Sequence, residues 1–315
     1  MSNTITLDSK IYIAGHNGMV GSACWRALEA KGYKNIIGFS SKELDLRDQR
    51  AVFEILEREK PEVIIDAAAK VGGILANSTY PYEFLMDNML IQNNLIKAAH
   101  ELDVPKFIFL GSSCIYPKMA SQPLKEEYLL TGPLEETNQW YAIAKISGVK
   151  LIEALREQFN RDYVSLMPTN LYGPGDNYDL ETSHVLPAML RKFHEAKENN
   201  HSDVLLWGTG TPKREFLHVD DLANAVVFAM ENKFEQSCYN VGSGSEISIM
   251  ELAELIKEIV GHKGSIVWDK NKPDGTFRKL LSTSRISKLG FFSKIKLNIG
   301  ITNLYKELIY GDDFK

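Results

Sequence analysis

The chain has 315 residues, of which 44% are hydrophobic and 24% charged, and its formal net charge is −5. This composition predicts a globular protein with enough apolar material for one large domain or two moderate ones. The acidic balance argues against a nucleic-acid-binding surface, so an anionic substrate would need a local cluster of lysine and arginine. No apolar run reaches the roughly 18 residues of a membrane span, and we expect none.

The cysteines and the first residues indicate the compartment. Cys24, Cys114 and Cys238 lack the spacing of metal ligands, and such a sparse, odd number is typical of a reducing environment. Residues 1–8 lack the basic-then-apolar pattern of a signal peptide. We therefore expect a cytoplasmic protein without a metal site.

The first half of the chain alternates short apolar runs with longer helical patterns. Strands are predicted at residues 10–14, 35–39, 63–68, 106–110 and 163–167. Helices are predicted between them at residues 18–31, 49–59, 82–102 and 141–159. Because the strands are apolar without polar alternation, they suit a parallel sheet that is covered on both faces. The pattern predicts an α/β fold with a doubly wound parallel sheet of the Rossmann type.

After Pro168 the pattern becomes less regular. A loop rich in glycine and proline precedes a helix, a strand, a second helix and a further strand, predicted at residues 183–199, 204–207, 218–231 and 238–241. We expect the last of these strands to return to the main sheet. The prediction is a nucleotide-binding domain over residues 1–174, to which residues 215–243 return, and a smaller substrate-binding lobe over residues 175–214 and 244–315.

A glycine-rich segment follows the first predicted strand and opens the first predicted helix. It consists of Gly15, His16, Asn17, Gly18, Met19, Val20 and Gly21. Glycines at such a turn allow close backbone approach and place a pyrophosphate at the helix N-terminus. The GxxGxxG spacing alone also fits a purely structural turn, but its place between strand and helix favours a dinucleotide cofactor.

The end of the second predicted strand bears on the choice of cofactor. An NAD enzyme usually places an acid there to hold the ribose 2′-hydroxyl. Here Ser40, Ser41 and Lys42 come first, and the first acid is Glu43. Hydroxyls and a lysine accommodate a 2′-phosphate, so the sequence favours NADP, with an ordinary polar loop as the alternative.

Two segments carry the candidate chemistry. Ser112 and Ser113 follow the strand at residues 106–110, and Tyr141 and Lys145 share one face of a helix at positions i and i+4. A lysine ammonium beside a phenol is expected to lower the pKa of the phenol. Tyr141 can then exchange a proton with a carbonyl or alcohol oxygen that a serine holds. This set suits hydride transfer beside a nicotinamide cofactor.

Together these segments resemble the extended short-chain dehydrogenases/reductases. Longer strings resemble, more narrowly, the GDP-L-fucose synthase family, and they lie at residues 67–74, 111–118, 168–174, 183–185, 214–221 and 272–276. The resemblance covers nearly the whole chain. It implies epimerisation of GDP-4-keto-6-deoxy-D-mannose at C3 and C5, followed by reduction of the C4 ketone with NADPH. It also implies a homodimer that packs two long helices of each subunit into a four-helix bundle.

The resemblance assigns roles to individual residues. Tyr141 takes the role of proton donor, Lys145 orients the cofactor, Ser112 holds the C4 oxygen, and Cys114 and His184 are the epimerisation base and acid. Besides the glycine-rich segment, the implied cofactor contacts are Ser41, Lys42, Leu110, Gly111, Ser112, Ser113, Lys145, Pro168, Thr169, Asn170, Leu171 and His184. The implied contacts to the nucleotide-sugar substrate are Lys192, Trp207, Arg214 and Asp274.

The epimerisation chemistry requires groups of these types. A 4-ketone acidifies the C–H bonds at C3 and C5, and inversion needs a base on one face of the sugar and an acid on the other. The enolate oxygen needs hydrogen-bond donors, which Ser112 and Tyr141 can supply. A thiol and an imidazole both titrate close to neutrality. On an extended chain Cys114 would point to the same side as Ser112, and His184, from a distant loop, suits the opposite face.

The sequence departs from the family pattern at Asn17, Ser41 and Lys192, where many relatives have arginine. The strength of any preference for NADPH over NADH is therefore left open. A 4,6-dehydratase is disfavoured because no pair of acids follows Ser112. Another sugar-nucleotide 4-epimerase or reductase would need no Cys/His pair and is the second choice. A non-catalytic NADP-binding sensor is a distant alternative, since such proteins typically lose the Tyr or the Lys.

Overall fold

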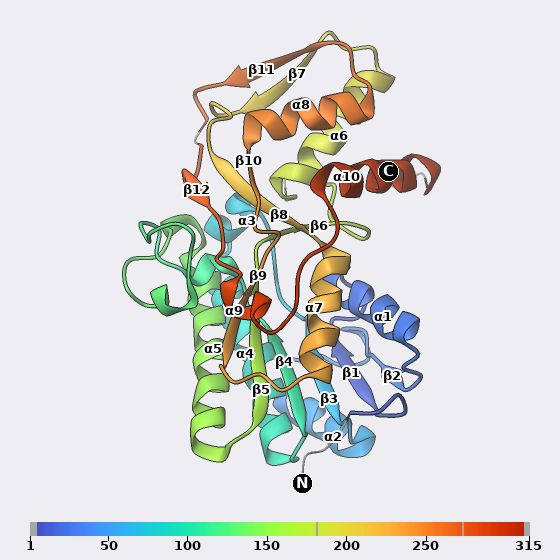
Figure 1. Cartoon of the computed structure of the whole chain (residues 1–315), viewed down its shortest axis with the longest axis vertical. Coiled ribbons are helices and arrows are strands. Elements are labelled where there is room, and N and C mark those ends of the chain that lie inside the picture. The colour runs from blue at the N-terminus through green and yellow to red at the C-terminus, as the bar shows by residue number, and fades with distance from the viewer. Residues whose placement is uncertain (1–4, 181, 273, 312–315) are drawn as a thin grey trace.

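The computed structural model describes residues 5–180, 182–272 and 274–311 (Figure 1). Residues 1–4 of the N-terminal segment and Pro273 in one of the family-like strings lie outside the described residues, as do the last residues of the predicted lobe. Within the described ranges, no helix combines the length and the apolar character needed to cross a membrane.

The main sheet has six strands in the order β2-β1-β3-β4-β5-β9, and every neighbouring pair is parallel. The strands are β1 (Ile11–Ala14), β2 (Ile36–Ile37), β3 (Val63–Asp66), β4 (Lys106–Leu110), β5 (Asp162–Pro168) and β9 (Cys238–Val241). All residues of β1, β3, β4 and β9 are buried, as expected for apolar strands with helices on both sides. The predicted α/β fold with a doubly wound sheet is confirmed, and so is the return of β9 to it.

Helices cover both faces of this sheet (Figure 1). One apolar core joins the sheet to α1 (Met19–Lys31) and α7 (Val219–Glu231). A second core lies on the opposite face, beneath α2 (Gln49–Glu59), α4 (Pro81–Glu101) and α5 (Gln139–Phe159). The helices α4 and α5 pack side by side, and Gln92 Nε2 of α4 donates to the Ala144 carbonyl of α5 at 2.6 Å.

A third core forms the smaller lobe at the top of Figure 1. It joins α6 (Val185–Glu198), α8 (Ile249–Val260) and α10 (Leu297–Gly311) to the parallel pair β7 (Asp203–Trp207) and β11 (Ser265–Asp269). A small sheet links this lobe to the main domain, with β8 (Lys213–His218) paired to β6 (Asn170–Tyr172), β10 (Glu246–Ser248) and β12 (Arg278–Lys279). Because β6 follows β5 directly, the carboxyl edge of the main sheet faces the linking sheet.

Three sequence expectations differ from the structure. The second strand is only Ile36–Ile37, because Gly38 already packs against the His16 ring. Ser113–Ile115 is a 3₁₀ helix (η1) rather than extended chain, since the Ser112 hydroxyl caps the turn. Residues near α9 (Ser284–Ser287) were assigned to the smaller lobe, but Ile286 and Phe291 pack into the first core beside α7. The remaining helices are α3 (Ile74–Thr79) and two 3₁₀ turns, Glu126–Tyr128 and Glu136–Asn138.

Candidate active site

The predicted site residues meet at the carboxyl edge of the main sheet. Gly15 follows β1, Asp66 ends β3, Leu110 ends β4 and Pro168 ends β5. From β1 the chain continues to β2 on one side of the sheet, whereas from β3 it continues to β4 on the other side. In open α/β sheets, ligands bind in the crevice at such a reversal.

The glycine-rich segment forms a tight cradle at this crevice. Gly15 has φ +78°, in the left-handed region that favours glycine, and its carbonyl accepts a hydrogen bond from the Gly18 N–H at 3.0 Å. A Cβ on Gly21 would collide with the Gly15 carbonyl and with the His16 Cα. No side chain caps the start of α1, so its first N–H groups suit a pyrophosphate. The cradle therefore fits a dinucleotide.

The turn after β2 lies beside this cradle because Gly38 contacts the His16 ring. The Glu43 carboxylate accepts hydrogen bonds from the Ser40 N–H at 2.8 Å and the Ser40 hydroxyl at 2.7 Å. These bonds lower the pKa of Glu43 and hold its charge within the turn. Ser41 and Lys42 are exposed, in positions open to a 2′-phosphate.

Lys145 lies at the centre of the site and is only 3% exposed. Its ammonium donates to the Leu110 carbonyl at 2.8 Å. The same nitrogen lies 5.8 Å from the ring centroid of Tyr141 and 4.7 Å from that of Phe109. The structure thus places Lys145 of α5 at the end of β4, with the Tyr141 ring beside it.

The charge state of Tyr141 differs from our expectation. Burial raises the pKa of the Tyr141 phenol above its usual value, and Cys114 and Asp66 raise it further. We expected Lys145 to lower this pKa, but in the chain alone burial outweighs the ammonium. The phenol therefore carries its proton at neutral pH, which is the form that can donate to a ketone oxygen.

Ser112 and Cys114 are brought together by the 3₁₀ turn. The Ser112 hydroxyl accepts a hydrogen bond from the Cys114 N–H at 3.3 Å, and Cys114 is 8% exposed. Burial raises the pKa of the Cys114 thiol, while Lys279, Ser112 and Lys145 lower it. The two side chains are thus neighbours, through a turn rather than through the extended geometry that we predicted.

His184 directly precedes α6 at its N-cap position. The residue as a whole is exposed, but the atoms around its ring lower the pKa of His184 by partial desolvation, and the Lys279 ammonium lowers it further. Lys279 therefore acts on both His184 and Cys114, the predicted acid and base. One lysine links these two residues, which lie 70 positions apart in the sequence.

The predicted substrate contacts form an outer cluster. Trp207 is 61% exposed, and two lysines flank its ring, with Lys192 Nζ at 6.0 Å and Lys272 Nζ at 5.0 Å from the centroid. Lys192 also donates to the Leu205 carbonyl at 3.1 Å. An exposed aromatic face between two cations suits a nucleobase with its phosphates.

Arg214 connects this outer cluster to the catalytic centre, because β12 pairs with β8 and sets Lys279 opposite Arg214. Burial lowers the pKa of Arg214, and the Asp274 carboxylate raises it. Asp274 accepts hydrogen bonds from the Thr209 N–H at 2.6 Å and the Thr209 hydroxyl at 2.8 Å. Asp274 thereby fixes the turn after β7, and its contact with substrate stays a prediction.

The remaining predicted cofactor residues line the joint between the two sheets. Thr169 Oγ1 and Asn170 Nδ2 both donate to the Glu215 carbonyl, at 3.3 Å and 2.7 Å. Their neighbours Pro168 and Leu171 lie in the strands on either side. Gly111, whose N–H donates to the Leu166 carbonyl at 2.9 Å, and Ser113 are buried at the end of β4.

Sequence reasoning missed three charged residues of this region. Lys272 begins the last family-like string and Lys279 follows it, but only the pairing of β12 with β8 brings Lys279 into the centre. Asp66 could have been found, because it is an acid inside the apolar strand predicted at residues 63–68.

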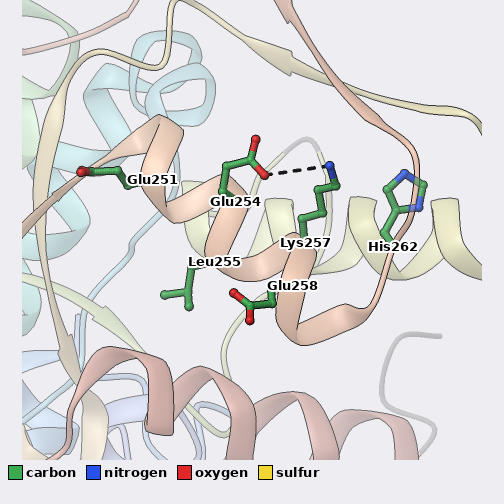
Figure 2. A pocket seen from close by; sticks show the side chains of 6 residues that line it. All are labelled: Glu251, Glu254, Leu255, Lys257, Glu258 and His262. Atoms are coloured by element: carbon green, nitrogen blue, oxygen red, sulfur yellow. Dashed lines mark ion pairs between the residues drawn. The ribbon is translucent and has the colours of Figure 1, made fainter.

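A hollow on the outer face of α8 lies apart from this site (Figure 2). Its lining residues are Glu251, Glu254, Leu255, Lys257, Glu258 and His262, and Lys257 pairs with Glu254 at 3.9 Å. Three carboxylates make this hollow unsuited to a diphosphate.

The parallel sheet, the glycine cradle and the Tyr–Lys pair define a nucleotide-dependent oxidoreductase or epimerase. Residues 11–242 match the NAD dependent epimerase/dehydratase family, and the chain belongs to that family. A putative GDP-L-fucose synthase 2 of Arabidopsis thaliana is 55% identical over 299 residues, which cover 95% of this chain and 91% of that protein. The GDP-L-fucose synthase of Escherichia coli K12 is 50% identical over 313 residues, with 96% and 98% covered. The structure of a GDP-L-fucose synthetase from Naegleria fowleri bound to NADP is 29% identical with a TM-score of 0.91, covering 98% of this chain and 95% of that one.

Proposed function

We infer that this protein converts GDP-4-keto-6-deoxy-D-mannose to GDP-L-fucose, by epimerisation at C3 and C5 and NADPH-dependent reduction at C4. The observation that best supports this proposal is that the Lys279 ammonium lowers the pKa of both Cys114 and His184, while the Ser112 hydroxyl accepts from the Cys114 N–H. A 4-reductase needs only the Ser, Tyr and Lys. A thiol and an imidazole at the same site add the base and acid of an epimerase.

In the epimerisation, Cys114 takes the proton from the carbon next to the ketone and His184 returns one to the opposite face. Ser112 and the Tyr141 phenol donate hydrogen bonds to the enolate oxygen that forms. The Lys279 ammonium stabilises the thiolate form of Cys114. The negative charge of the substrate diphosphate offsets the effect of Lys279 on His184 and so favours the imidazolium that must act as the acid.

In the reduction, NADPH supplies the hydride to C4 when it is bound. Tyr141 donates its proton to the C4 oxygen, and the Lys145 ammonium stabilises the phenolate that is left. Gly15, Gly18 and Gly21 leave room for the pyrophosphate at the start of α1. Ser41 and Lys42 are the residues proposed to meet the 2′-phosphate.

The substrate diphosphate is proposed to bind at the outer cluster. Lys192, Arg214, Lys272 and Lys279 concentrate positive charge there, although the whole chain has a net charge of −5. This is the local basic cluster that an anionic substrate requires. Trp207 offers its exposed ring to the nucleobase.

The test is incubation of the protein with GDP-4-keto-6-deoxy-D-mannose and NADPH. We expect one NADPH to be oxidised per product molecule and the product to have inverted configuration at C3 and C5. Reduction at C4 without inversion would support the second choice, a sugar-nucleotide reductase. No oxidation of NADPH would contradict the proposal. Cys114→Ser is expected to slow solvent exchange at C3 and C5, with Cys24→Ser, buried in α1, as the matched control.

We further propose that the protein is a homodimer. Tyr82, Met86 and Leu90 are exposed at successive i+4 positions of α4, and Trp140 and Ile143 are exposed on the adjacent α5. An apolar stripe across two neighbouring helices suits the same pair of helices of a second copy. A cytoplasmic location is proposed as well, supported by the free thiols of Cys24, Cys114 and Cys238.

A further inference from the structure

A carboxylate that the mechanism above does not use lies at the end of a buried strand. Asp66 is the last residue of β3 and is 0% exposed. Burying a charged carboxylate is costly unless an opposite charge or hydrogen bonds compensate for it. A buried carboxylate at this position therefore needs an opposite charge or hydrogen bonds that offset the cost of its desolvation.

The strand register places Asp66 close to Lys145. Asp66 is directly opposite Phe109 on β4 and opposite Ala14 on β1. Side chains alternate along a strand, so Asp66 shares the face of Ile64, which packs with Phe109 in the second core beneath α5. Lys145 reaches this face from α5, with Nζ 4.7 Å from the Phe109 ring centroid.

The hydrogen bonds of Asp66 and Lys145 do not use all of their acceptors and donors. One oxygen of Asp66 accepts from the Ala68 N–H at 3.2 Å, while the other is buried with no hydrogen-bond partner among the described residues. Lys145 has three N–H donors, and the Leu110 carbonyl accepts one of them. The carboxylate and the ammonium therefore attract each other in the buried interior, where water screens the attraction little.

We propose that Asp66 is a positioning residue for the reduction, whose carboxylate keeps Lys145 protonated and thereby supports Tyr141 as proton donor. This inference rests on the proposed function. The other titratable groups on this side are the Tyr12 and Tyr141 phenols and the Cys114 thiol, whose ordinary pKa values lie above 7 and are raised further by burial, so they are neutral at pH 7.

The charges on the two partners agree with this role. Burial lowers the pKa of Lys145, and Asp66 opposes that effect more than Cys114 does. Burial raises the pKa of Asp66 to about 6, although Lys145 and the Ala68 N–H act to lower it, so most of the carboxylate is ionised at neutral pH. Without this counter-charge, Lys145 would lose its proton at a lower pH, and the phenolate left on Tyr141 would lose its stabilisation.

The test uses Asp66→Asn, which keeps the shape of the side chain and removes its charge. The single-turnover rate of ketone reduction is measured across about pH 6 to 10, with saturating NADPH. We expect the alkaline limb of the profile to move toward neutral pH by about one unit, since an opposite charge at close range shifts a pKa by about 1–3 units. The rate above that limb then falls about tenfold, and the rate near pH 6 changes little.

Asp221→Asn is the matched control, because Asp221 is 2% exposed and its oxygens accept from the Lys294 and Ile295 N–H groups, away from Lys145. It should lower thermal stability and leave the pH profile in place. In a Lys145→Met background, Asp66→Asn should have no further effect on the rate.

An unchanged alkaline limb in folded Asp66→Asn would overturn the inference, and so would an equal effect of Asp66→Asn with and without Lys145. If Asp66→Asn fails to fold, Asp66→Leu supplies an apolar side chain of similar size for the same profile. If the wild-type protein reduces the ketone and Asp66→Asn has the same rate and pH profile, only this inference is refuted. Wild-type protein that does not reduce it refutes the proposed function itself.

Discussion

Replacing Lys279 by methionine tests the link between the two predicted epimerisation residues. Of the groups that lower the pKa of the Cys114 thiol, Lys279 has the largest effect, and it also lowers the pKa of His184. Methionine keeps most of the length of the side chain and removes the charge. The pKa of Cys114 should therefore rise in Lys279→Met, because the thiolate loses its main electrostatic support.

The size of this change follows from the surroundings of the two groups. Cys114 is 8% exposed and Lys279 is half-buried, so water screens their interaction only in part. A close opposite charge shifts a pKa by about 1–3 units, and the lower end of that range suits a partly screened pair. One unit means about tenfold less thiolate at a pH below the pKa. Exchange of the C3 and C5 protons should slow by about the same factor at neutral pH and recover as the pH rises.

The assay follows deuterium entry at C3 and C5 of GDP-4-keto-6-deoxy-D-mannose by NMR. Saturating substrate removes effects on binding, and NADP⁺ in place of NADPH prevents reduction from consuming the ketone. Lys213→Met is the control, because Lys213 is on the neighbouring strand and pairs instead with Glu246 at 3.6 Å. Exchange at the wild-type rate with an unchanged pH dependence in Lys279→Met would refute the reasoning.

Three further predictions concern the reduction, the cofactor and the oligomer. Tyr141→Phe should lower the rate of ketone reduction by about 10²–10⁴-fold and leave NADPH affinity nearly unchanged in a fluorescence titration; reduction at the wild-type rate would exclude Tyr141 as the donor. Gly21→Ala should weaken NADPH binding about tenfold or more in the same titration, because its Cβ meets the Gly15 carbonyl and overpacking costs about 1–3 kcal/mol. Met86→Glu, on the exposed stripe of α4, should convert the proposed dimer to monomer in sedimentation equilibrium; a dimer that persists would locate the interface elsewhere.

The periodic parts of the fold were predictable from the sequence. The apolar runs at β1, β3 and β4 and the long helical patterns of α1, α2 and α5 reflect local burial, which a single segment reveals. The glycine cradle was predictable for a similar reason. The close contact between Gly21 and the Gly15 carbonyl joins residues that are only six positions apart in the sequence.

The parts that sequence reasoning missed depend on side-chain hydrogen bonds and on tertiary contacts, which hydrophobic patterns do not reveal. The 3₁₀ turn at Ser113–Ile115 forms because the Ser112 hydroxyl competes for the Cys114 N–H, which apolar patterning does not reveal. The pKa of Tyr141 rises chiefly because the surrounding fold buries it, and burial is set by the tertiary structure. Lys279 lies in the centre of the site because β12 pairs with β8, which sets Lys279 opposite Arg214, a residue 65 positions earlier in the chain.

The most direct test of the central claim is the isotope pattern of the product formed in D₂O with unlabelled NADPH. If one site performs both epimerisations and the reduction, the product is GDP-L-fucose with deuterium at C3 and C5 and with protium delivered to C4. A reduced product without deuterium at C3 and C5, or with the original configuration at either carbon, would contradict it.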